Sequence, residues 1–158
     1  MPITMNDLTI SPNGIDMDTL LSEWTWAMPE PLRPVLLTAM GDVFAQSESG
    51  TVYFVDMVEG NIRVVADDGD SFQSLMKNTQ FVTDHMFPSR IVQFRNAGIS
   101  LQRGQVYSHK QLLVLGGDDD IGNVEATDVS VHVSIHGQVH RQVKDLPDGT
   151  PISEIKLE

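Results

Sequence analysis

Residues 34–66 decide the fold, and they read PVLLTAMGDVFAQSESGTVYFVDMVEGNIRVVA. Four short runs rich in β-branched and aromatic residues lie within this stretch: Pro34 to Met40, Asp42 to Gln46, Thr51 to Asp56 and Asn61 to Ala66. The separators, Ser-Glu-Ser-Gly at 47–50 and Glu-Gly-Asn at 59–61, are good hairpin turns. In the third run both alternating sets are apolar, so we expect both faces of that strand to be covered. The stretch predicts an antiparallel meander.

Helical sequence follows the meander. Phe72, Phe81 and Ile91 each belong to a short apolar stripe at helical spacing. Pro88 is a good first-turn residue for the third stripe, and Gly98 is placed as its C-terminal cap. We therefore expect three short helices between the meander and Gly98.

The segments at either end of this block are less regular. Residues 1–14 predict an extended lead-in, and Asp16 can cap a short helix that carries Trp24. Beyond the predicted helices, a second β region is expected from Leu101 to Leu115, and Gly116 to Asp120 is expected to be a loop.

The last segment, Asp128 to Leu146, fits two structures. Alternation from Val129 to Ile135 has the period of a strand, whereas Val131, Ile135, Val139 and Val143 fit one face of a helix. Asp128 as a cap and Lys144 to Pro147 as a stop favour the helix. The resulting fold class is α+β, with an antiparallel sheet and helices packed around it.

Composition bounds the function. The chain has 158 residues and 41% hydrophobic residues, enough for one domain with its own core, so we expect residues 1–158 to form a single domain. There is no cysteine, which excludes thiolate chemistry and cysteine metal sites. MPITMNDLTISPNG has no basic start and no apolar run, and no stretch approaches 18 apolar residues. We therefore expect no signal peptide, no membrane span and a cytoplasmic protein.

Charge points to the kind of partner. The net charge is −12, from 22 acids against 10 bases. Such a field repels nucleic acid and anionic membranes and attracts basic partners, although it also serves ordinary solubility.

Candidate catalytic and metal sites are weak. His132, His136 and His140 are spaced by four, so two of them could share a metal on a helix, but no glutamate completes a zinc-protease motif. Hydrogen-bonding or partly buried histidines are the simpler interpretation. No phosphate-binding loop or serine elbow is present. We predict no catalytic, cofactor-binding or metal-binding residues.

Two acidic clusters have equally ordinary interpretations. Asp118, Asp119 and Asp120 do not match a calcium loop, because the sixth position lacks glycine and the twelfth lacks glutamate. Asp67, Asp68 and Asp70 are typical acids at a helix N-terminus.

Three stretches carry a family resemblance. Ala39 to Phe44 with Gly50 to Asp56 resembles the meander of the GAD-like domain. Gly104 to Lys110, followed by Leu115-Gly116-Gly117, Asn123, Glu125 and Asp128, and then Val131 to Pro147, resemble the C-terminal domain family of type VI secretion immunity proteins. The GAD-like part would cover about residues 30–97 and the family-signature part about 98–150.

The resemblance implies a SUKH (Smi/Knr-type) α+β fold in which the last segment is a helix. It also implies an antitoxin-type protein that is not an enzyme and that neutralises a toxin by protein–protein contact; the best-known relatives neutralise a secreted DNase. The residues that match the family motif are expected to form a polar network that holds loop to helix: Tyr107, Lys110, Gly116, Gly117, Asn123, Glu125, Asp128 and His132.

The sequence thus predicts an immunity protein with a basic toxin as partner. The acids at Asp67, Asp68 and Asp70 and at Asp118, Asp119 and Asp120 are the candidate contacts. Two alternatives stay open: a small-ligand or intracellular interaction module with no toxin partner, and a hydrolase or metal enzyme that uses His132, His136 and an acid.

Overall fold

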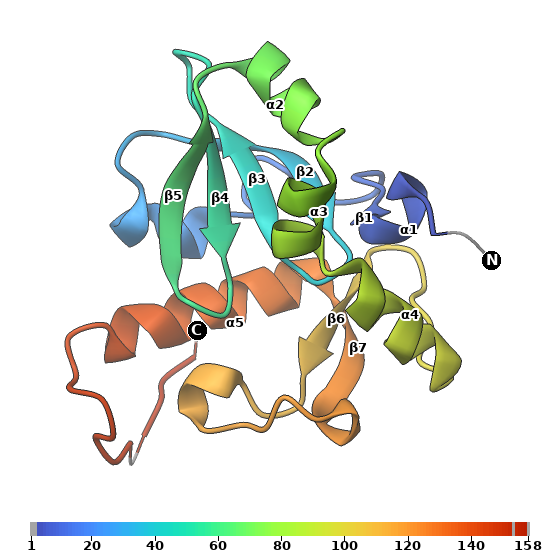
Figure 1. Cartoon of the computed structure of the whole chain (residues 1–158). Helices are drawn as coiled ribbons and strands as arrows, with labels where there is room; N and C mark the ends of the chain where they lie inside the picture. The colour runs from blue at the N-terminus through green and yellow to red at the C-terminus, as the bar shows by residue number, and fades with distance from the viewer. Residues whose placement is uncertain (1–2, 153, 158) are drawn as a thin grey trace.

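An antiparallel meander forms the larger sheet of the molecule (Figure 1). The computed structural model describes residues 3–152 and 154–157. The five strands follow the order of the chain across the sheet, and each neighbouring pair is antiparallel. They are β1 (Thr9–Ile10), β2 (Arg33–Thr38), β3 (Val43–Gln46), β4 (Val52–Asp56) and β5 (Asn61–Ala66).

The four predicted strands are therefore confirmed, and the short edge strand β1 is an addition. Residues 1–14 were expected to be an extended lead-in, but a one-turn helix, α1 (Met5–Leu8), precedes β1. The side chain of Asp7 accepts a hydrogen bond from the Thr4 backbone N–H, which supports the first turn of α1.

Both faces of β4 are covered, as its double alternation predicts. On one face, Phe54 packs in a cluster with Phe44 and with Phe72 of the helix α2. On the other face, Val55 belongs to a cluster that includes Trp24. The sheet is thus a middle layer, with Phe72 packed on one face and Trp24 on the other.

Three short helices follow the meander, as predicted: α2 (Gly69–Leu75), α3 (Thr79–Met86) and α4 (Pro88–Asn96). Asp68 caps α2 by accepting a hydrogen bond from the Ser71 N–H. Gly98 adopts a positive φ of 83° just past α4 and closes it with a backbone bond to Arg95.

The second β region differs from its prediction. Only β6 (Gln105–His109) is a strand within the expected range 101–115, and Leu113–Leu115 is a 3₁₀ turn, η2. The partner of β6 is β7 (Val124–Asp128), which pairs with it in antiparallel register. The chain has to reverse direction between β6 and β7 for the two strands to pair. Residues 110–123 form this connection, so β6 ends at His109.

The last segment is the helix α5 (Val129–Val143), which resolves the ambiguity of the sequence in favour of the helix. Asp128 caps it by accepting from the N–H groups of Ser130 and Val131. Figure 1 shows α5 running beneath the lower end of the sheet.

A 3₁₀ helix, η1 (Ser22–Ala27), packs against α5. The indole of Trp24 is fully buried and donates to the Val133 carbonyl at 2.9 Å. Asp16 was expected to cap an α-helix carrying Trp24, but turns follow Asp16 and η1 begins only at Ser22. The conformation of this segment is therefore set by the packing of the indole against α5 and not by helical propensity.

Candidate functional site

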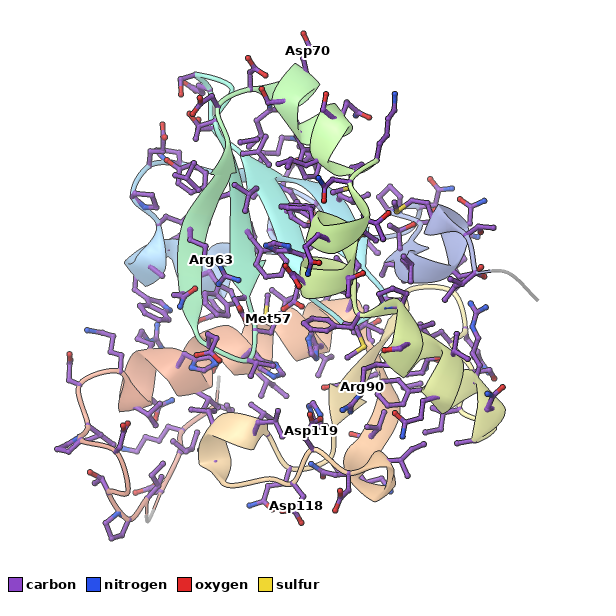
Figure 2. The ribbon with its side chains drawn as sticks, in the orientation of Figure 1. Met57, Arg63, Asp70, Arg90, Asp118 and Asp119 are labelled. Carbon is purple, nitrogen blue, oxygen red and sulfur yellow. The ribbon has the colours of Figure 1, made fainter. Side chains whose placement is uncertain are left out.

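A cleft of about 340 Å³ opens where the lower end of the sheet meets α3, α4, α5 and the loop after β6. Ligand sites usually fall in roughly this size range or above it. Of the residues that line the cleft, Figure 2 shows Arg63 and Met57 at the sheet and Arg90 and Asp119 below them in the view. The lining includes five carboxyl groups but only two guanidinium groups: Asp42, Asp56, Glu59, Asp84 and Asp119 against Arg63 and Arg90.

Arg63 belongs to the sheet wall and is held within it. Its Nη1 donates to Asp56 Oδ2 and to Asn61 Oδ1, both at 2.9 Å. The guanidinium also lies 5.0 Å from the centre of the Phe54 ring, a favourable cation–π position. The charge of Arg63 is therefore balanced by its own wall of the cleft.

Arg90 forms the matching group on the opposite wall. Its guanidinium makes two bonds to the Asp119 carboxylate, at 2.9 and 3.1 Å, and lies 5.0 Å from the ring centre of Phe94. His109 adds a contact to the same carboxylate at 3.1 Å. Burial opposes ionisation of Asp119, but the bonds from Arg90 and His109 outweigh it and lower its pKa. The Nε of Arg90 is buried without a partner among the described residues.

Asp42 lies at the inner end of the cleft, at the turn into β3, and is 5% exposed. Its Oδ1 accepts a hydrogen bond from the Met57 N–H at 2.9 Å. Burial raises the pKa of Asp42 to about 8, so this carboxyl is mostly protonated at neutral pH. A protonated carboxyl can donate as well as accept, which makes Asp42 an adaptable polar group.

The three histidines of α5 are buried and bonded within the chain. His132 Nδ1 shares a hydrogen bond with the Ser108 hydroxyl, His136 donates to the His132 carbonyl, and His140 donates to the Met57 carbonyl, each at 2.7 Å. Burial lowers the pKa of His136 to about 4 and also lowers the pKa values of His132 and His140. Among the described residues, no group of three or more histidine and acidic side chains could hold a metal ion.

Two apolar residues are exposed beside the acids of the cleft. Phe87, between α3 and α4, is 39% exposed, and Val58, in the β4–β5 turn, is 45% exposed. Phe87 has a φ of 52°, a left-handed conformation that a bulky residue rarely adopts. This conformation lets α4 begin directly after α3 ends. The cleft thus combines exposed apolar groups with a carboxyl-rich lining.

The predicted acidic contacts fall at opposite ends of the molecule. Figure 2 shows Asp70 at the upper end, on α2, and Asp118 at the lower end, in the loop before β7. Asp67, Asp68 and Asp70 are exposed, as are Asp118, Asp119 and Asp120. Asp119 differs from its two neighbours because Arg90 holds it at the cleft.

The predicted polar network is found only in part. Asn123 fastens the loop: its Oδ1 accepts from the Gln111 N–H, and its Nδ2 donates to the carbonyls of Gln111 and Asp118. Lys110 contributes its backbone N–H, which donates to the Asn123 carbonyl.

The remaining members of the predicted network lie elsewhere. Tyr107 donates its hydroxyl to the Ile99 carbonyl, His132 contacts Ser108, and Asp128 caps α5. Gly116 takes a positive φ of 90° at the end of η2, and the Gly117 N–H donates to the Leu112 carbonyl. Glu125 is exposed on β7. The set therefore stabilises several separate places and does not form one continuous chain of bonds.

The sequence pointed to some of the residues that line the cleft, namely Tyr107, Asp119 and His132, but not to others. Arg63 and Arg90 come from segments far apart in the chain, and no local motif marks them. Asp42 had a signal, because it lies in the Gly41-Asp42 pair of the GAD-like stretch, but its burial could not be read from that pair.

Comparison with known families supports the resemblance seen in the sequence. Residues 66–140 match the family model described as "T6SS immunity protein Tdi1, C-terminal". The match begins at the last residue of β5 and ends within α5, so it contains both acidic clusters and about half of the residues that line the cleft. The resemblance to the immunity-protein family is thus confirmed over these residues, and the stretch before residue 66 lies outside the match.

A solved structure shares the fold. The chain resembles the "Crystal structure of Atu4351 from Agrobacterium tumefaciens" with a TM-score of 0.57 at 16% sequence identity. The alignment covers 78% of this chain and 64% of that one. At this identity the likeness concerns the fold alone. No curated protein matches the sequence. Within the described part of the chain, none of the helices has the length and apolar character needed to cross a bilayer.

Proposed function

We propose that this protein is an immunity protein that binds a toxin effector and neutralises it by protein–protein contact, without catalysis of its own. The observation that carries the proposal is the match of residues 66–140 to an immunity-protein family. The protein acts in the cytoplasm, where it meets the toxin before the toxin reaches its target.

The charge supports a basic toxin, and a nuclease is the class we propose. Nucleases present basic surfaces to hold phosphates, and a chain with a net charge of −12 complements such a surface and is steered to it. Binding then blocks the active site or the approach of DNA.

The lower end of the molecule is the proposed contact surface. It carries Asp118 and Asp120, and Asp119 joins it to the cleft through Arg90. Asp67, Asp68 and Asp70 lie at the other end, so one partner of ordinary interface size would cover one cluster and not both.

Co-expression tests the function. We expect the gene beside this one to encode the toxin, which should stop growth when expressed alone, and this protein should restore growth. A stoichiometric amount of the purified protein should also inhibit DNA cleavage by that toxin, and added salt should weaken the complex. Growth arrest that persists when both proteins are produced, with no complex formed between them, would sink the proposal.

One alternative is favoured by a specific observation. The cleft of about 340 Å³ is large enough for a small molecule, which would suit a ligand-binding module with no toxin partner. Growth rescue separates the two functions, because a ligand-binding module would not restore growth.

A further inference from the structure

We propose that the cleft receives a basic side chain, a lysine or an arginine, from the toxin that this protein binds. The inference rests on the proposed function and adds to it the chemistry of one contact. It starts from the combination of exposed apolar groups and excess carboxyl groups around a single opening.

The charge inside the cleft favours a cation. Both guanidinium groups are already paired, Arg63 with Asp56 and Arg90 with Asp119. Glu59 has no ion pair within the described part of the chain, and Asp84 bonds only the neutral amide of Gln80. An incoming anion would have to displace a carboxylate from an arginine, whereas an incoming cation meets unpaired carboxylates.

The inner end adds a buried carboxyl that can serve an N–H donor. Asp42 lies beneath the β4–β5 turn, and one of its oxygens is already used by Met57. His132 lines the same cleft at 4% exposure, but its Nε2 faces the backbone of Gly41, so the carboxyl groups and not this ring favour a cation.

The shape of a lysine or arginine matches these features. Each has an apolar stem of several methylene groups and a charged head. Phe87 and Val58 offer apolar contact to the stem, and Glu59, Asp84 and Asp42 offer oxygen acceptors to the head. A bare metal ion would gain nothing from the apolar groups.

Small probes test the cleft without the toxin. We expect n-butylguanidinium and n-butylammonium to shift the backbone amide signals of residues 57–60 saturably in an NMR titration of the full chain. The same concentrations of n-butanol and butyrate should leave these signals in place. Equal shifts by the neutral probe, preferential shifts by butyrate, or no shift by either cation would overturn the proposal.

A matched pair of variants then tests the partner. The double variant Glu59→Gln/Asp84→Asn removes two charges at the cleft. The variant Asp67→Asn/Asp70→Asn removes two at the far end, where Figure 2 places Asp70. All four residues are exposed. The cleft variant should bind the neighbouring toxin about fivefold more weakly or worse, with the far-end variant close to wild type. Circular dichroism should show both variants folded.

The outcomes separate the two proposals. Equal weakening by both variants would show an effect of net charge alone, and an unchanged cleft variant that still binds the butyl cations would assign the cleft to a free small cation; either result overturns the inference and leaves the immunity function standing. If the wild-type protein binds no toxin, the function fails and the toxin side-chain assignment fails with it. The probe titration still decides separately whether the cleft selects cations.

Discussion

The imidazole of His132 lies against Gly41, so closely that a Cβ at residue 41 would stand 2.1 Å from Nε2. Gly41 has a φ of 90° and forms the tight turn between β2 and β3. The same arrangement recurs at the β4–β5 turn, where a Cβ at Gly60 would lie 2.3 Å from His140 Nδ1. At both places, histidine side chains of α5 pack against a glycine in a turn of the sheet, where a larger residue would not fit.

Replacing Gly41 by alanine should destabilise the fold. The substitution adds left-handed backbone strain and a clash with His132, together about 2 to 4 kcal/mol of unfolding free energy. Gly50→Ala is the control, because Gly50 has a φ of 99° with open space where its Cβ would stand, and it should lose only about 1 kcal/mol. Urea denaturation measures both, and equal losses would mean that the contact with His132 contributes nothing.

The buried histidines should make the protein sensitive to acid. The pKa of His136 is about 4 in the folded chain and 6.5 in the unfolded chain, so the unfolded chain binds more protons between these values. Stability should fall as the pH drops from 6.5 towards 4. His136→Phe should reduce this slope by up to about 1.4 kcal/mol per pH unit, measured by urea unfolding at several pH values. Parallel slopes in variant and wild type would contradict the assignment.

Asp42 should act in the opposite direction. Its pKa is about 8 in the folded chain against 3.8 unfolded, so the folded chain binds more protons between these values. Its contribution is lost as the pH rises from about 4 to about 8. Asp42→Asn keeps an acceptor for the Met57 N–H but cannot ionise, so its stability relative to wild type should grow with pH across this window. A stability difference that stays constant from pH 5 to pH 8 would refute the shifted pKa.

The sheet and the helices were readable from the sequence because their signals are local. Alternation in Val52 to Asp56 and hairpin turns define the meander, and Asp128 with the helical stripe after it defines α5. These features depend on residues a few positions apart, where propensity and capping act.

The sequence predicted β6 but not its partner β7, and it did not predict the cleft, because both depend on contacts between residues far apart in the chain. The strand β7, Val-Glu-Ala-Thr-Asp, has little apolar character, and its conformation depends on pairing with β6. Arg63 and Arg90 lie near one opening only because the meander and α4 are brought together by packing. Trp24 likewise takes its place from a bond to Val133 that is 109 residues away in the chain.

Asn123 should control the order of the loop before β7. Removing its side chain in Asn123→Ala deletes three hydrogen bonds to the backbone, at a cost of about 2 kcal/mol. Amide hydrogen exchange at Gln111 and its neighbours should accelerate. Glu125→Ala, at an exposed member of the same family motif, should change stability by no more than about 0.5 kcal/mol. Equal exchange rates at Gln111 in the two variants would show that Asn123 does not hold the loop in place.

Charge reversal should identify the end of the molecule that meets the toxin. Asp118→Lys/Asp120→Lys should slow association with the toxin by about tenfold, because electrostatic steering sets the rate of encounter. Asp119 is left in place since it holds Arg90. The control, Asp67→Lys/Asp70→Lys, makes the same change of net charge at the far end and leaves the Asp68 cap intact. Stopped-flow mixing at low and high salt measures both rates; equal slowing would show that net charge alone matters, and slowing only in the control would move the contact surface to α2.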